Sequence, residues 1–143
     1  MKPFTSIRIA RWGRYEVASG TISVLRTDAP KIVRASGKSV LIDLDFGAGH
    51  EESLQGFFHL AMGLCRIAAK EDGLYAVSIE WKQEAIDYLA AGKYAYLVPA
   101  FEITNARRPR RVVGLALTNT SVAGFQRMQD LLPEELVELE PER

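Results

Sequence analysis

Few side chains in this sequence could activate a nucleophile or donate a proton at neutral pH. Two histidines occur, His50 and His59. His50 follows a Gly-Ala-Gly run, where a histidine is more often solvated than catalytic, and His59 lies among aromatic and aliphatic residues, which favours a packed side chain. His50 is therefore the backup general base. Ser78 is the backup nucleophile, with Thr118 and Ser121 as further alternatives, although a hydrogen-bonding or solvent-facing role is simpler for each of them.

Metal or cofactor chemistry has little support in the sequence. Oxygen and imidazole ligands concentrate in one stretch, which contains Asp43, Asp45, His50, Glu51 and Glu52. This stretch lacks the glycine and the ligand spacing of a calcium loop, so we expect a solvated acidic loop and no metal. The sequence contains no Gly-rich phosphate loop and no dinucleotide fingerprint, and we expect no cofactor.

A basic cluster and a single cysteine complete the candidates. Four arginines, Arg107, Arg108, Arg110 and Arg111, surround a proline in the run NARRPRR. This run predicts an exposed hairpin tip that could dock an acidic partner surface or, less favoured, nucleic acid. Cys65 cannot form an internal disulfide or a cysteine-cluster metal site, and we expect a buried, inert thiol in a reducing compartment.

Length and charge restrict the protein class. A chain of 143 residues supports one domain with its own core, and its 18 basic and 18 acidic residues give a net charge of zero. Zero net charge gives no global case for binding nucleic acid or an anionic membrane, and it favours self-association. The N-terminus lacks the pattern of a secretory signal, and Arg66 and Lys70 interrupt the most apolar stretch. We therefore expect a soluble intracellular protein with no membrane partner.

Hydrophobic periodicity and turn residues predict many strands and a few short helices. Strands are expected at Phe4–Ala10, in two short runs within Tyr15–Leu25, at Val40–Ile42, Met62–Ala69, Leu74–Trp81, Tyr94–Thr104 and Arg111–Thr118. Helices are expected from a Thr27 cap to Gly37, from Lys82 to Ala91 with Gly92 as the stop, around Phe125–Leu132, and from Pro133 through Leu139. The Asp72-Gly73 pair predicts a hairpin. On the strand that follows this hairpin, Tyr75, Val77, Ile79 and Trp81 should share one face.

This pattern predicts an α+β fold, a mainly antiparallel, barrel-like single domain with two or three short helices. The barrel should occupy residues 1–123. A short, helical, acidic tail should occupy residues 124–143.

The region from Gly73 to Asn119 carries a resemblance. It contains a strand ending in Trp81, a short helix, the run Tyr94-Ala95-Tyr96-Leu97-Val98-Pro99-Ala100-Phe101 and the strand end Ala116-Leu117-Thr118-Asn119. This order resembles the Mu-like phage head-maturation (prohead) protease family of the Mu "I protein" type. The resemblance implies a closed, mainly antiparallel β-barrel flanked by helices. It also implies a serine nucleophile just before the proline and a histidine base in an Ile-Asp-x-x-His type motif.

The sequence departs from the family pattern at both catalytic positions. Val98 lies where the resemblance implies the serine, and Phe46 lies where it implies the histidine. Neither side chain can take part in proton transfer, so we predict a degenerate site.

Three functional hypotheses follow. The first is a catalytically inactive prohead-protease-like phage or prophage protein. It would act in capsid assembly or as a virion component, bind capsid or scaffold proteins, self-associate, and reside in the host cytoplasm or the virion. The second is an active serine peptidase of head maturation with a relocated nucleophile and His50 as base. The third is a nucleic-acid-contacting module that uses the Arg107–Arg111 tip.

Overall fold

The computed structural model describes residues 4–17, 20–44 and 61–119. Its strands are β1 (Ile7–Arg11), β2 (Gly13–Val17), β3 (Gly20–Val24), β4 (Val40–Leu44), β5 (Gly63–Lys70), β6 (Gly73–Trp81), β7 (Tyr96–Ile103) and β8 (Pro109–Thr118). Its helices are the short 3₁₀ turn η1 (Arg26–Asp28), α1 (Ala29–Ser36) and α3 (Gln83–Ala90). The two predicted C-terminal helices and the boundary at residue 123 lie outside the described residues.

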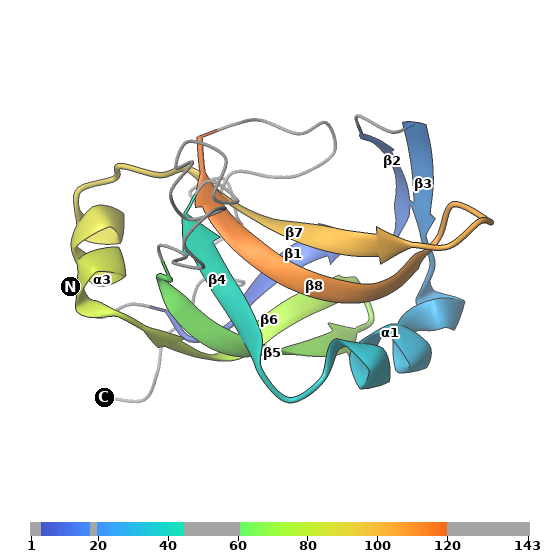
Figure 1. Ribbon diagram of the computed structural model, residues 1–143, viewed down its shortest axis with the longest axis horizontal. Coiled ribbons are helices and arrows are strands. Elements are labelled where there is room, and N and C mark those ends of the chain that lie inside the picture. The colour runs from blue at the N-terminus through green and yellow to red at the C-terminus, as the bar shows by residue number, and fades with distance from the viewer. Residues whose placement is uncertain (1–3, 18–19, 45–60, 120–143) are drawn as a thin grey trace, which may run out of the picture.

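Six strands form one curved sheet in the order β1-β6-β5-β4-β8-β7, and β2 and β3 form a separate hairpin (Figure 1). The pairs are antiparallel except for β4 and β8, which run parallel. The edge strands β1 and β7 also contact each other, so the sheet is nearly closed. Helices α1 and α3 lie at opposite ends of this barrel (Figure 1). The predicted α+β, barrel-like fold is confirmed.

The core fills the inside of this sheet with branched aliphatic side chains. The largest fully buried apolar ones are Ile7, Ile22, Val24, Ile32, Ile42, Met62, Leu74, Val112, Leu115 and Leu117. Helix α1 contributes Ala29, Ile32 and Ser36, whose spacing places them on one buried face. The hydroxyl of Ser36 donates to the Ile32 carbonyl at 2.7 Å and accepts the Val112 amide at 2.9 Å, which ties α1 to β8.

Local turn chemistry fixes two of the predicted connections. The β5–β6 hairpin turns at Glu71 and Asp72, and Gly73 begins β6, where a Cβ would collide with the Ala10 carbonyl oxygen. Helix α3 ends at Gly92, whose φ is 66°. The amides of Gly92 and Lys93 bond back to the carbonyls of Leu89 and Tyr88, which is a Schellman ending. The prediction of Gly92 as the helix stop is confirmed.

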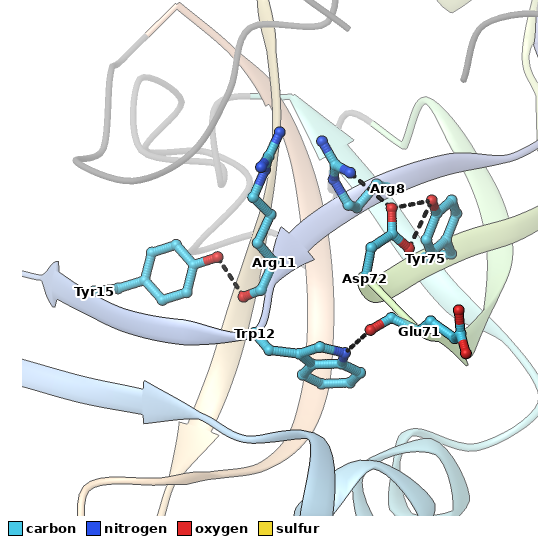
Figure 2. A network of polar contacts seen from close by, with 7 residues as sticks. All are labelled: Arg8, Arg11, Trp12, Tyr15, Glu71, Asp72 and Tyr75. Atoms are coloured by element: carbon cyan, nitrogen blue, oxygen red, sulfur yellow. Dashed lines mark hydrogen bonds and ion pairs between the residues drawn. The ribbon is translucent and has the colours of Figure 1, made fainter. Parts of the chain in front are cut away.

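A polar network joins β1 to the β5–β6 turn (Figure 2). The Arg8 guanidinium lies 2.7 Å from the Asp72 carboxylate, which also accepts the Tyr75 hydroxyl. Burial alone would raise the pKa of Asp72, but the hydrogen bonds from Arg8 and Tyr75 outweigh it and lower the pKa. The Trp12 indole donates to the Glu71 carbonyl beside them. These contacts hold the turn against the first strand.

Two local predictions were wrong. Thr27 does not cap α1. The residue before the helix is Asp28, and its side chain makes no capping bond because its carboxylate is bound by Arg108. The single apolar face proposed for β6 is broken at Ser78, where two residues of β6 lie opposite one residue of β5. Leu74 and Ala76 reach the core before this bulge, and Ile79 reaches it after.

Candidate functional site

Val98 lies on β7 with its side chain away from the barrel core. Its neighbour Leu97 belongs to the core cluster, so the strand alternation places Val98 on the opposite face. Val98 pairs with Ala116 of β8, and the two residues are 3% and 0% exposed. The position that the family resemblance assigns to a nucleophile is therefore a buried, apolar one.

The parallel β4–β8 pair places an acidic residue in the same row. Asp43 pairs with Ala116, while its neighbours Ile42 and Leu44 pair with Leu115 and Leu117 in the core. Asp43, Ala116 and Val98 thus form a row across three strands, which we call the outer row. Strands lie about 4.8 Å apart, so about 10 Å separates the backbones of Asp43 and Val98.

The outer row lies where β4 ends and β7 begins. Strand β4 ends at Leu44, and the predicted degenerate base position Phe46 follows two residues later, outside the described residues. The backup base His50 and the second histidine, His59, also lie outside them. The structure therefore brings the end of β4 to about 10 Å from Val98, and the predicted contact between Phe46 and Val98 stays untested.

The chemistry of the outer row is limited. Val98 and Ala116 carry neither a nucleophile nor a titratable group. Thr118, a candidate hydroxyl two residues beyond Ala116, is 1% exposed, so a substrate could not reach it in this conformation. Cys65 on β5 is also buried, and burial raises the pKa of its thiol to about 12, which keeps it protonated and unreactive.

The arginine run extends from the turn between β7 and β8 into the start of β8, and two of its members, Arg107 and Arg108, are half-buried and bonded to other parts of the molecule. Arg107 has a φ of 60°, its carbonyl accepts the Ser23 amide at 3.0 Å, and its Nε donates to the Thr21 carbonyl at 3.2 Å. The tip is thereby attached to the β2–β3 hairpin.

Arg108 makes a two-bonded contact with Asp28 at the start of α1. Its Nε and terminal nitrogen lie 2.8 and 2.6 Å from the two carboxylate oxygens. Hydrogen bonding from Arg108 lowers the pKa of Asp28, and the same contact raises the pKa of Arg108. Arg110 and Arg111 remain at the surface, where both approach Glu102, at 3.9 and 3.2 Å.

A family model describes most of this chain. The model for the N-terminal domain of the Mu-like prophage I protein matches residues 8–132. The chain belongs to this family. A comparison with curated proteins and a comparison with solved structures each gave no match. The resemblance drawn from the strand and helix order between Gly73 and Asn119 is thus confirmed at the level of the family.

Asn119, the last residue of the segment that carries the resemblance, has a structural role in this member of the Mu-like I protein family. The Asn119 side chain, which ends the Ala-Leu-Thr-Asn strand, accepts the Ala95 amide at 3.0 Å and donates to the Lys93 carbonyl at 2.8 Å. These bonds fix the chain just before β7 begins. Asn119 therefore positions the strand that carries Val98.

The backup nucleophile Ser78 is exposed on β6, a strand that carries no residue of the outer row. Strand β1 lies between β6 and β7 where the barrel closes, and β5, β4 and β8 lie between them on the other side. The φ of 51° at Ser78 is unusual for a residue other than glycine, and the bulge accounts for it because the extra residue must leave the ladder. The proposed pairing of Ser78 with His50 stays untested, since His50 lies outside the described residues.

Sequence reasoning missed two residues near the arginine tip. Asp28 and Lys31 line a pocket together with Arg108 and Arg110. Asp28 and Arg108 are 80 positions apart, so no local pattern announces their contact. The only sequence signal is an acidic residue at a helix start, and that signal points to capping instead. For the described ranges, no group of three or more histidine, cysteine, aspartate or glutamate side chains could hold a metal ion.

Neither α1 nor α3, the helices in the described ranges, has the length and the apolar character that crossing a membrane requires.

Proposed function

We propose that this phage-family protein acts in capsid assembly by binding, as a virion or assembly component, and does not hydrolyse peptide bonds. The observation that carries the proposal is Val98, an apolar side chain that is 3% exposed at the position where the family resemblance expects a serine. Serine-protease chemistry needs a hydroxyl that a base can deprotonate and a substrate can reach. Val98 meets neither condition.

The surroundings of Val98 support the same proposal. Ala116, directly opposite, is fully buried and has no group that could accept or donate a proton. Asp43 lies one strand further on, with its backbone about 10 Å from that of Val98, and a carboxylate there is not a hydroxyl nucleophile at position 98. Loss of the nucleophile alone lowers the turnover of a serine protease by roughly 10⁶-fold. A barrel without the serine nucleophile still has a surface that can bind partner proteins in the host cytoplasm or in the phage particle.

The direct test is proteolysis. The purified protein is incubated with casein and with the precursor of its phage's major capsid protein, and in parallel with a serine-directed fluorophosphonate. We expect no cleavage and no label, with an active serine protease as the positive control. A pull-down from phage-producing cells should recover capsid or scaffold protein.

The relocated-nucleophile alternative gives a different result. Cleavage or labelling that is lost in both Ser78→Ala and His50→Ala would contradict the proposal and identify a new catalytic pair. Cleavage that survives Ser78→Ala but is lost in His50→Ala would retain His50 as the base and move the nucleophile elsewhere, for example to Ser121.

A further inference from the structure

A pocket lies between the start of α1 and the β7–β8 tip, far along the sheet from the outer row. Its volume is about 260 Å³, and it is lined by Asp28, Lys31, Thr104, Ala106, Arg108, Pro109 and Arg110. Arg108 and Asp28 are joined by their two-bonded ion pair, so this part of the lining is held in place. We call it the tip pocket.

The charges of the tip pocket do not cancel. Three cationic side chains face one carboxylate, and that carboxylate is already bound by Arg108. Lys31 is exposed, and the Arg110 side chain is 71% exposed and lies 3.9 Å from Glu102, which is too long for a hydrogen bond. The start of α1 adds a partial positive charge, and no side chain caps it. The pocket therefore attracts anions.

Its size and lining fit carboxylates better than a nucleic acid backbone. A pocket of about 260 Å³ holds one or two acidic side chains, whereas a duplex or a single strand needs a stripe of cations along several phosphates. The lining contains no aromatic side chain on which a base could stack. Lys31 on α1 and Arg110 on β8 line the pocket from two different elements, so an acidic peptide can be bound from both.

We propose that the tip pocket binds the acidic segment 134–142 of the same molecule. This segment reads EELVELEPE and carries five glutamates, against which Lys31 and Arg110 supply the complementary charge. Strand β8 runs nine residue steps from Pro109, beside the pocket, to Thr118, a distance of about 30 Å. The sixteen residue steps from Thr118 to Glu134 can span about 40 Å even when Phe125–Leu132 is counted as the expected helix, so the segment can reach the pocket.

Binding of segment 134–142 to the tip pocket does not depend on whether the protein hydrolyses peptides. An acidic segment of a capsid or scaffold partner would have to displace segment 134–142 from the pocket. The exchange would be sensitive to salt, because both sides are charged and near the surface.

The experiment uses the full-length protein and a carbodiimide that joins a lysine amine directly to a carboxylate. Mass spectrometry of the digested product then counts links from Lys31 to the glutamates of 134–142. Lys38 is the matched control, because it is exposed just after the same helix and does not line the pocket. We expect links at Lys31 well above those at Lys38, and their loss in 1 M salt, where the Debye length is about 3 Å.

Arginine variants sharpen the test. Arg110→Ser should reduce the Lys31 links, whereas Arg111→Ser, which changes a neighbouring arginine outside the pocket, should not. Mixing isotope-labelled and unlabelled protein should give links within one molecule. Equal linking of Lys31 and Lys38, no effect of Arg110→Ser, or links only between molecules would overturn the proposal. It would also be overturned by salt-dependent DNA retention that Lys31→Ser and Arg110→Ser abolish without any Lys31 link.

Discussion

The burial of Val98 can be tested by changing its polarity and its volume separately. Val98→Thr keeps the shape and adds one hydroxyl, Val98→Ala removes two methyl groups, and Val98→Ser does both. At 3% exposure an unpartnered hydroxyl should cost about 1 to 3 kcal/mol of unfolding free energy. The two lost methyl groups should cost about 1.6 kcal/mol at about 0.8 kcal/mol each, before any cavity cost. Val98→Ser should therefore be the least stable of the three, by about 3 to 5 kcal/mol relative to the parent.

The assay is equilibrium urea unfolding, with the slope of the transition compared to confirm that only stability changed. Val113→Thr is the matched control, because Val113 is 46% exposed on the adjacent strand β8 and should change stability by less than about 0.5 kcal/mol. The reasoning would be refuted if Val98→Thr and Val98→Ser were as stable as the parent. That result would mean that a partner for the hydroxyl still exists at this position. Labelling of Val98→Ser by a fluorophosphonate would then show that the base persists as well.

Three further predictions concern the elements around the site. Ser36→Ala should destabilise the fold by about 1 to 3 kcal/mol, measured by urea unfolding, because it leaves the buried Val112 amide without its acceptor; a change below 0.5 kcal/mol would count against this tie. The pKa of Asp28 is lower in the folded protein than in the unfolded chain, where it is near 4. Its ionised carboxylate therefore stabilises the fold above about pH 4, and this stabilisation is lost as the pH falls through the pKa of the folded protein. Asp28→Asn should therefore flatten the decline of the urea midpoint below about pH 4, and an unchanged decline would exclude the Arg108 contact as its cause. Asn119→Ala should cost about 1 kcal/mol and speed hydrogen exchange at the start of β7, and protection equal to the parent would show that Asn119 does not hold that strand.

Local signals in the sequence were sufficient for the hairpins and for the C-terminal ends of the helices, but not for the start of α1. The Asp72-Gly73 pair located the β5–β6 turn to within one residue, and Gly92 gave the end of α3, because both glycines adopt positive φ angles that few other residues adopt. The barrel class followed from the strand pattern and from the resemblance together.

Long-range pairing was beyond the reach of these signals. The parallel β4–β8 pair places Asp43 beside Ala116 although they are far apart in the chain, and no periodicity within either strand indicates that register. The bulge at Ser78 could not be predicted for a related reason. The prediction assumed that side chains alternate strictly between the two faces of β6, but the extra residue at the bulge shifts every later side chain to the other face. Arg108 was predicted to lie on an exposed tip, and its side chain is 40% exposed, but its ion pair with Asp28 could not be predicted because the two residues come together only in the folded chain.

The features that identify the family and the features that would perform its chemistry are separate in this molecule. The Asn119 side chain fixes the chain before β7 through hydrogen bonds to main-chain atoms of Ala95 and Lys93. These bonds do not depend on the side chain at position 98. Val98 pairs with Ala116 and is buried, so its side chain takes part in packing. On the proposed function, the chain keeps the strand on which the resemblance places a nucleophile without keeping the nucleophile. A family match over residues 8–132 identifies the family, and whether this member cleaves peptides is what the casein and fluorophosphonate assays on the parent and on the Val98 variants test.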